Sequence, residues 1–249
     1  MEIINTDRER HFLQQLTLPE KVRFYEELAQ YCLDRRKELL DNIIESRTKH
    51  VTVVLENIYQ SQNASATLRT SEIMGVQDVH IIENEHEYTL NPDVVIGSAQ
   101  WIHCRRYNEQ ENNTKHCLNQ LKQDGYLIAA TLPNENCISI EDIDISKKIA
   151  FVFGNEKTGL SDIAIEAADV SVKIPMFGFT ESYNISVSVA LCLYELMQRL
   201  RKSDIDWRLS EDEKYLEKIL WAKQSINKNP DMLFDAVTRK LFPEYAEKR

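Results

Sequence analysis

The sequence predicts an α/β protein whose mainly parallel sheet is covered by helices on both faces, with a helical extension at each end of the chain. Three features support this class. Short β-branched runs alternate with segments of helical periodicity between residues 49 and 202, which is the pattern of a parallel sheet with crossover helices. The flanking segments 1–48 and 203–249 show helical spacing alone. We therefore expect three parts, at 1–48, 49–202 and 203–249.

Five strands are expected in the middle part. They are the runs HVTVVLEN, DVHII, YLIAATL, KIAFVFG and VSVKIP, at 50–57, 78–82, 126–132, 148–154 and 170–175. Each is short and rich in β-branched residues, as buried strands are. In sheets of this kind ligands bind beyond the carboxyl ends of the strands. Polar segments that directly follow a strand are therefore the candidate sites.

Helices are expected between these strands and in both flanks. One covers 64–75, with Asn63 as its cap and Gly75 at its end, and Ser161 caps a short helix in SDIAIEAA. The other expected helices lie near 112–124, 184–202, 207–226 and 232–242, with two or three more in 8–48. Those of the flanks are amphipathic, so they are expected to pack against a core or a partner subunit.

Composition excludes several classes of protein. No run of 18 apolar residues is present and the N-terminus has no apolar signal segment, so neither a membrane span nor secretion is expected. Five scattered cysteines without a CxxC pair indicate reduced thiols in a cytoplasmic protein. The pairs His103-Cys104 and His116-Cys117 lack the ligand spacing of a zinc site, so no metal is expected. The net charge of −10 falls mainly on the middle part, which argues mildly against nucleic acid there.

Three polar segments follow expected strands. The first, NASATLRT, contains Asn63 and Arg69, and the second, FVFGNEKTGLSD, contains two glycines around Glu156. The glycines have the separation of a phosphate-binding loop, but the Lys and Ser/Thr that should follow are missing, so a Walker loop is rejected. The third segment, KIPMFGFTESYN, ends in Ser182 and Asn184, two capping residues where one cap is needed. Each segment alone is a weak signal.

In this order and spacing, the three segments resemble the signature motifs of the SpoU (TrmH-type) branch of the SPOUT RNA methyltransferases. The resemblance covers about residues 30–202, and the flanking helices resemble the extensions of the members that act on guanosine-18 of tRNA. It implies a deep trefoil knot at the C-terminal side of the sheet, an S-adenosylmethionine cofactor bound in the knot, a homodimer and a tRNA substrate. The matching residues are Asn63, Ala66, Arg69, Gly154, Glu156, Lys157, Gly159, Ile174, Pro175, Met176, Gly178, Ser182 and Asn184.

The resemblance also implies roles for these residues. Arg69 would meet the ribose 2′-hydroxyl, either as a base or, as its high pKa favours, by stabilising the alkoxide electrostatically. Asn63 would orient Arg69 or the ribose, and Glu156 would hold the second loop or contact the partner's site. Ser182 and Asn184 would fix the cofactor loop and the RNA phosphate. Cofactor contacts are expected from Thr131, Gly154, Asn155, Gly159, Ile174, Met176 and Tyr183.

The expected RNA contacts come from the two basic clusters outside the acidic region. These are Arg35, Arg36 and Lys37, and Arg199, Arg201 and Lys202. Two departures from the family pattern stand near the site, Glu181 in place of the usual glutamine and Asn155 in the second motif. The expected function is 2′-O-methylation of tRNA, at guanosine-18 of the D-loop. A ribosomal RNA 2′-O-methyltransferase and a non-catalytic RNA-binding protein with the same fold are the alternatives.

Overall fold

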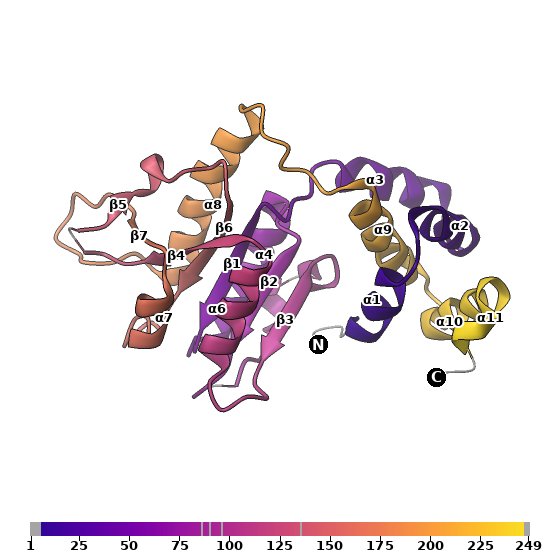
Figure 1. Cartoon of the computed structure of the whole chain (residues 1–249), viewed down its shortest axis with the longest axis horizontal. Coiled ribbons are helices and arrows are strands. Elements are labelled where there is room, and N and C mark those ends of the chain that lie inside the picture. The colour runs from indigo at the N-terminus through magenta and orange to yellow at the C-terminus, as the bar shows by residue number, and fades with distance from the viewer. Residues whose placement is uncertain (1–5, 86, 90, 96, 135, 247–249) are drawn as a thin grey trace. The chain divides into compact units, whose positions relative to one another are not determined.

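The computed structural model describes residues 6–246 apart from 86, 90, 96 and 135 (Figure 1). The described chain forms two compact units. One covers Thr48–Trp207 and contains the sheet. The other combines residues 6–47 with residues 208–246, so the N- and C-terminal extensions belong to one helical unit. None of the helices in the described residues is long and apolar enough to cross a membrane.

The sheet has seven parallel strands in the order β3-β2-β1-β6-β4-β7-β5. Their bounds are β1 Val51–Glu56, β2 Asp78–Ile82, β3 His103–Tyr107, β4 Tyr126–Thr131, β5 Ile138–Ser139, β6 Lys148–Phe153 and β7 Val170–Lys173. The α/β class and the parallel sheet are therefore confirmed. β3 and β5 were not predicted. β3 has the sequence HCRRY at the edge of the sheet, where arginines remain partly exposed, and β5 is two residues long.

Helices cover both faces of the sheet, as predicted. Side chains of α4 (Ser61–Met74) and α8 (Ile185–Arg201) pack on one face, in one apolar cluster with Val53 and Phe151. Side chains of α6 (Asn113–Gln123) and α7 (Asp162–Ala167) pack on the other, with Val54 and Val152. The alternation of strand side chains between the two clusters is the period of two expected for a strand. Short helices α5 (Pro92–Val95), η1 (Ser98–Gln100) and η2 (Ile140–Asp142) complete this unit.

The helices end and begin at the capping residues predicted from the sequence, except that Asn63 is not a cap. Gly75 ends α4 in the left-handed conformation, with φ of 91°, and Ser161 caps α7 by accepting from the backbone N–H of Ala164. Asn184 caps α8, so it takes the role that Ser182 could also have filled. Asn63 does not cap α4, because that helix begins at Ser61 and Gln60 is the cap. The Asn63 side chain lies one turn further along and is free for another role.

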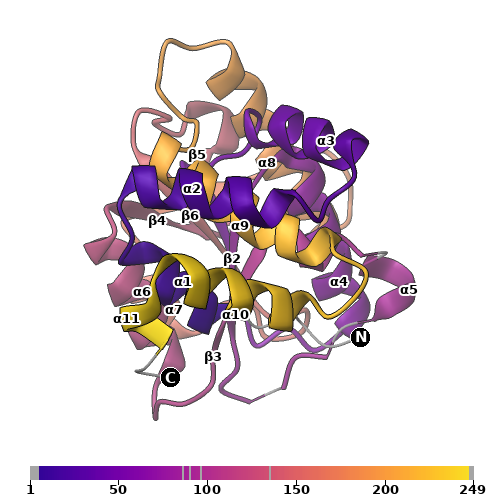
Figure 2. The ribbon, with the colours of Figure 1, turned by 90° about the vertical axis from the view of Figure 1, so that its right-hand side faces the viewer.

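The helical unit contains α1 (Asp7–Gln14), α2 (Leu18–Ala29), α3 (Asp34–Ile44), α9 (Glu211–Ser225), α10 (Pro230–Leu241) and α11 (Pro243–Ala246). α9 packs against α2 and α3 (Figure 2). Its core includes the edge-to-face ring pair Phe12–Phe24, with centroids 6.2 Å apart. The buried guanidinium of Arg10 donates two hydrogen bonds to the Glu217 carboxylate, at 2.6 and 2.7 Å. A buried bidentate pair of this kind fixes the register of α1 against α9.

Candidate active site

A pocket of about 580 Å³ lies at the carboxyl ends of β4, β6 and β7. Its walls come from four stretches far apart in the sequence: the start of α4, residues 131–133 at the end of β4, the loop 153–160 after β6, and the segment 172–192 that ends β7 and begins α8. This is the position at which open parallel sheets bind ligands. All three of the polar segments singled out in the sequence contribute to this pocket.

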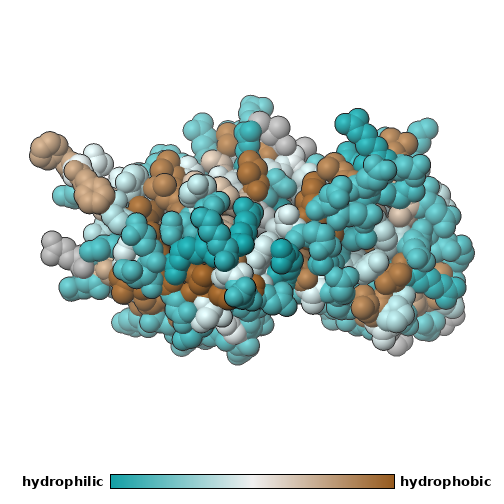
Figure 3. Space-filling model, turned by 90° about the horizontal axis from the view of Figure 1, so that it is seen from above, coloured by the Kyte–Doolittle hydropathy of each residue, from teal (hydrophilic) through white to brown (hydrophobic). Residues whose placement is uncertain are grey.

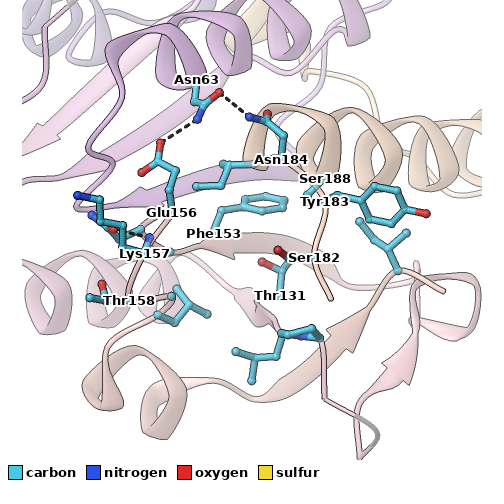
Figure 4. Close-up of a pocket in the computed structure, with 18 of the residues that line it drawn as sticks. Asn63, Thr131, Phe153, Glu156, Lys157, Thr158, Ser182, Tyr183, Asn184 and Ser188 are labelled. Carbon is cyan, nitrogen blue, oxygen red and sulfur yellow. Dashed lines mark hydrogen bonds between the residues drawn. The ribbon is translucent and has the colours of Figure 1, made fainter. Parts of the chain in front are cut away.

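The central feature of the pocket is a chain of hydrogen bonds between Glu156, Asn63 and Asn184 (Figure 4). The Asn63 amide nitrogen donates to the Glu156 carboxylate at 2.8 Å, and the Asn63 carbonyl oxygen accepts from the Asn184 amide at 2.9 Å. Asn63 is only 7 % exposed, so both bonds are partly buried even though Asn184 itself reaches the surface. One residue from each of the three segments is thereby tied to the next.

Glu156 also ties its loop to the N-terminus of α4. Its carboxylate accepts from the backbone N–H groups of Tyr59 at 3.0 Å and Gln60 at 3.3 Å. Burial raises the pKa of Glu156, but the hydrogen bonds from Asn63 and from these backbone groups together lower it by more than burial raises it. The pKa of Glu156 therefore lies below its ordinary value. The carboxylate is therefore ionised at neutral pH, and its charge lies where the positive end of the helix dipole favours it.

The two glycines of the second segment are required for different reasons, one for lack of space and the other for its backbone conformation. At Gly154 a Cβ would lie 2.2 Å from the Gly159 carbonyl carbon, so no side chain fits. Gly159 has space around it but needs a φ of +74°, which glycine adopts without strain. The backbones of Asn155 and Gly159 exchange two hydrogen bonds of 2.9 Å and close the loop between them. The Asn155 side chain donates to the Asn57 carbonyl at 2.6 Å, so it anchors the loop to the end of β1.

The predicted site residues are placed as follows. All of the predicted cofactor contacts line the pocket, and so do four of the five predicted catalytic residues: Asn63, Thr131, Gly154, Asn155, Glu156, Gly159, Ile174, Met176, Ser182, Tyr183 and Asn184. Arg69 does not. It lies on α4, is exposed, and makes no hydrogen bond or ion pair with another described residue. Glu181 is also exposed and outside the lining.

The six basic side chains predicted to contact RNA differ in whether they already bond to other groups of the protein. Arg199 donates to the backbone carbonyls of Ile140 and Ile143, at 3.3 and 2.7 Å, and so holds the segment after β5. Arg201 donates to the Met74 carbonyl at 3.2 Å, and Lys37 pairs with Asp34 at 2.6 Å. The side chains of Arg35 and Lys202 are exposed and make no hydrogen bond or ion pair with another of the described residues. Arg36 is half-buried and has electrostatic partners of its own.

Sequence reasoning missed several lining residues. Phe153, Leu160, Val172 and Ile185 give the pocket apolar walls, and Thr158 adds a polar group beside Lys157, which the motif had already included. The apolar residues belong to strand ends and to the first turn of α8, so they read as ordinary core. Only their position beside the glycine loop could have indicated a second role. The described residues hold no group of three or more His, Cys, Asp or Glu side chains placed to bind a metal.

The fold and this pocket define a methylase of the SpoU type, and the chain belongs to the SpoU rRNA Methylase family, whose model matches residues 50–194. Among its relatives is the tRNA (guanosine(18)-2′-O)-methyltransferase of Borreliella burgdorferi, 48% identical over 80% of this chain and 89% of the relative. The crystal structure of the A. aeolicus TrmH/SpoU tRNA modifying enzyme has a TM-score of 0.67 and 30% identity, over 78% of this chain and 98% of that one.

A more distant structure shares the fold. The SpoU methyltransferase AviRb from Streptomyces viridochromogenes, solved in complex with AdoMet, has a TM-score of 0.51 at 18% identity. It covers 65% of this chain and 62% of its own. The resemblance read from the three sequence motifs is confirmed by these comparisons.

Proposed function

We propose that this protein transfers a methyl group from S-adenosylmethionine to the ribose 2′-hydroxyl of guanosine-18 in tRNA. The observation that carries the proposal is the hydrogen-bonded chain Glu156–Asn63–Asn184, which joins the three family motifs at one pocket. The tRNA substrate is supported by relatives of that name, which this chain matches over 89% and 97% of their lengths. One relative with another substrate in its name, a 23S rRNA (guanosine-2′-O-)-methyltransferase of Acinetobacter baylyi, is matched over 62% of its length.

The pocket fits an adenosine-containing cofactor. A volume of about 580 Å³ lies within the range of roughly 300–1,000 Å³ that small-molecule sites occupy. The ends of β4 and β7 bring Thr131 and Ile174 to the lining, and the missing side chain of Gly154 lets the two ends of the loop close tightly on one another beside them. When bound, S-adenosylmethionine supplies a methyl group on a positively charged sulfur. Apolar walls such as Phe153 and Leu160 exclude water from such a group.

The residues around the pocket then act by holding and orienting. The Asn63 amide is fixed on both sides, so it holds the entry of α4 at a constant distance from the α8 cap. Ser182 and Asn184 stand on the segment that would close over the cofactor. Arg69 would stabilise the negative charge that develops on the ribose oxygen as its proton leaves to water, because a guanidinium rarely gives up a proton. We further propose that the segment 174–184 is threaded into a trefoil knot.

The exposure of Arg69 on a helix face that does not line the pocket supports a homodimer. Apolar side chains reach the surface of the protein (Figure 3), and Val187, Leu191 and Tyr194 form one stripe of α8, at 44%, 38% and 56% exposure. Ile73 of the adjacent α4, four residues after Arg69, is 65% exposed. We propose that a second copy covers this stripe and brings its Arg69 to the pocket of the first. Sedimentation of the protein as a monomer at micromolar concentration would contradict this arrangement.

The activity is tested with tritium-labelled S-adenosylmethionine and unmodified tRNA transcripts. Label on the natural transcript, absent from a transcript with 2′-deoxyguanosine at position 18 and absent with Arg69→Ala protein, is the expected result. Label that persists on the deoxy transcript would move the target elsewhere in the tRNA. No label on any tRNA would overturn the proposed substrate, and ribosomal RNA would be tested next.

A further inference from the structure

A buried carboxylate that none of the motifs contains lies behind the pocket. Glu56 ends β1, an internal strand of the sheet, and is 1% exposed. Its Oε1 accepts from the hydroxyls of Thr114 at 2.6 Å and Ser161 at 2.7 Å, and its Oε2 accepts from the Ser161 backbone N–H at 2.9 Å. A buried charge is costly unless it is fully hydrogen-bonded, and here three short bonds offset that cost.

These bonds attach to the far end of the pocket loop. Ser161 directly follows Gly159 and Leu160, which line the pocket, and its hydroxyl also caps α7. The near end of the loop is held by the residue that directly follows β1. Asn57, in the left-handed region with φ of 52°, turns its carbonyl to the Asn155 amide at 2.6 Å. Residues 56 and 57 therefore clamp both ends of the loop that carries Glu156.

We propose that Glu56 is a positioning residue for the pocket, acting through Ser161 on the loop 154–160 and so on the Glu156–Asn63–Asn184 chain. The inference rests on the proposed function for the identity of the ligand. Glu156 can hydrogen-bond to Asn63 and to the start of α4 only if its loop keeps its position relative to the end of β1. Glu56 does not line the pocket, so its effect on ligand binding passes through the loop alone.

The substitution Glu56→Gln keeps the size of the side chain and removes the acceptor set. If the amide nitrogen takes the place of Oε2, it faces the Ser161 N–H, donor against donor. If it takes the place of Oε1, the hydroxyl protons of Thr114 and Ser161 lose their acceptor. In the first orientation the Ser161 N–H loses its acceptor, and in the second that bond remains but both hydroxyls must turn to accept from the amide nitrogen, so the attachment of the loop end is weakened in either case. Thr114→Val is a milder variant on α6 that removes one of the three bonds and leaves the charge in place.

The chain offers a matched control at the end of the neighbouring strand. Glu83 follows β2, is 7% exposed, and accepts from the Arg106 guanidinium at 2.7 and 2.9 Å and from the Asn108 amide at 3.0 Å. It is also a buried carboxylate at a strand end that accepts several hydrogen bonds, although its main partner is a charged guanidinium, and none of the donors named here lines the pocket. Glu83→Gln therefore costs stability without loosening the pocket loop.

The experiment measures S-adenosylmethionine and S-adenosylhomocysteine affinity by calorimetry without RNA, then kcat and KM for tRNA, well below each variant's melting temperature. Glu56→Gln is expected to weaken cofactor binding about tenfold and to lower kcat by up to a hundredfold, since misplacement by about 1 Å costs that much. Thr114→Val should show a smaller change in the same direction. Glu83→Gln should melt earlier and bind the cofactor as the unmodified protein does.

Two results would overturn the proposal. One is unchanged cofactor affinity and kcat in folded Glu56→Gln protein, which would make Glu56 a stability residue only. The other is an equal loss of affinity in Glu83→Gln, which would make the effect a general one of any buried carboxylate. Failure of the tRNA activity itself is a separate outcome, because the calorimetric comparison needs no RNA substrate.

Discussion

Gly154 provides the sharpest test of how the pocket loop is built. In Gly154→Ala the new Cβ would lie 2.2 Å from the Gly159 carbonyl carbon and 2.3 Å from both the Gly159 oxygen and the Leu160 nitrogen. All three are backbone atoms, so no side chain can turn away. The loop must move by about 1 Å to restore ordinary contact, and overpacking of this kind costs about 1–3 kcal/mol. For a unit of this size, about 2 kcal/mol corresponds to a fall of roughly 4–8 °C in melting temperature.

The same displacement opens the pocket, so cofactor affinity should fall together with stability. Gly178→Ala is the matched control, because Gly178 lies in the adjacent pocket segment, has no positive φ, and its Cβ would meet nothing within 4 Å. Thermal melting and calorimetric titration with S-adenosylmethionine check both quantities in the two variants. If Gly154→Ala has the melting temperature and the cofactor affinity of the unmodified protein, the two backbones do not approach each other at this loop as closely as the structure shows. Equal losses in both variants would also refute the reasoning.

Three further predictions concern residues outside this loop. Burial lowers the pKa of His80 from 6.5 to about 3, so the native state stays neutral while the unfolded chain takes up a proton, and unfolding free energy should fall by about 2 kcal/mol between pH 7 and pH 5. Urea titrations at the two pH values should show less of this dependence in His80→Gln, and an unaltered dependence would assign it to other groups. Asn63→Asp removes a donor and places a second carboxylate against Glu156, so cofactor affinity should drop about tenfold, whereas the exposed neighbour Gln62→Glu should have little effect. Arg199→Ala frees two backbone carbonyls and should destabilise the α/β unit by about 1–3 kcal/mol in urea unfolding. Lys202→Ala should leave stability unchanged and reduce tRNA affinity in a salt-dependent way. If instead Lys202→Ala lowered stability and Arg199→Ala lowered only tRNA affinity, both assignments would be wrong.

The sequence predicts most of the sheet because its buried strands are continuous apolar runs. It does not predict β3, whose HCRRY pattern depends on its place at the sheet edge. The candidate site, too, could be predicted only in part. The three polar segments are visible as motifs, but the bonds that join them link residues 93 and 121 positions apart, and no local pattern contains that information. Asn63 illustrates the limit. Its residue type suits a helix cap, and the structure uses Gln60 as the cap instead.

The chemistry of the side chain explains why position 63 carries an amide. Its nitrogen must donate to a carboxylate at 2.8 Å while its oxygen accepts from the Asn184 amide at 2.9 Å. A carboxylate at this position could only accept, and an ammonium could only donate, so either would break one of the two bonds. The Asn184 amide repeats the logic, since its oxygen accepts from the Ser186 backbone N–H while its nitrogen donates to Asn63. The order of donors thus runs from the α8 cap to the loop carboxylate, and the ionised Glu156 at its end sets the direction for the whole chain.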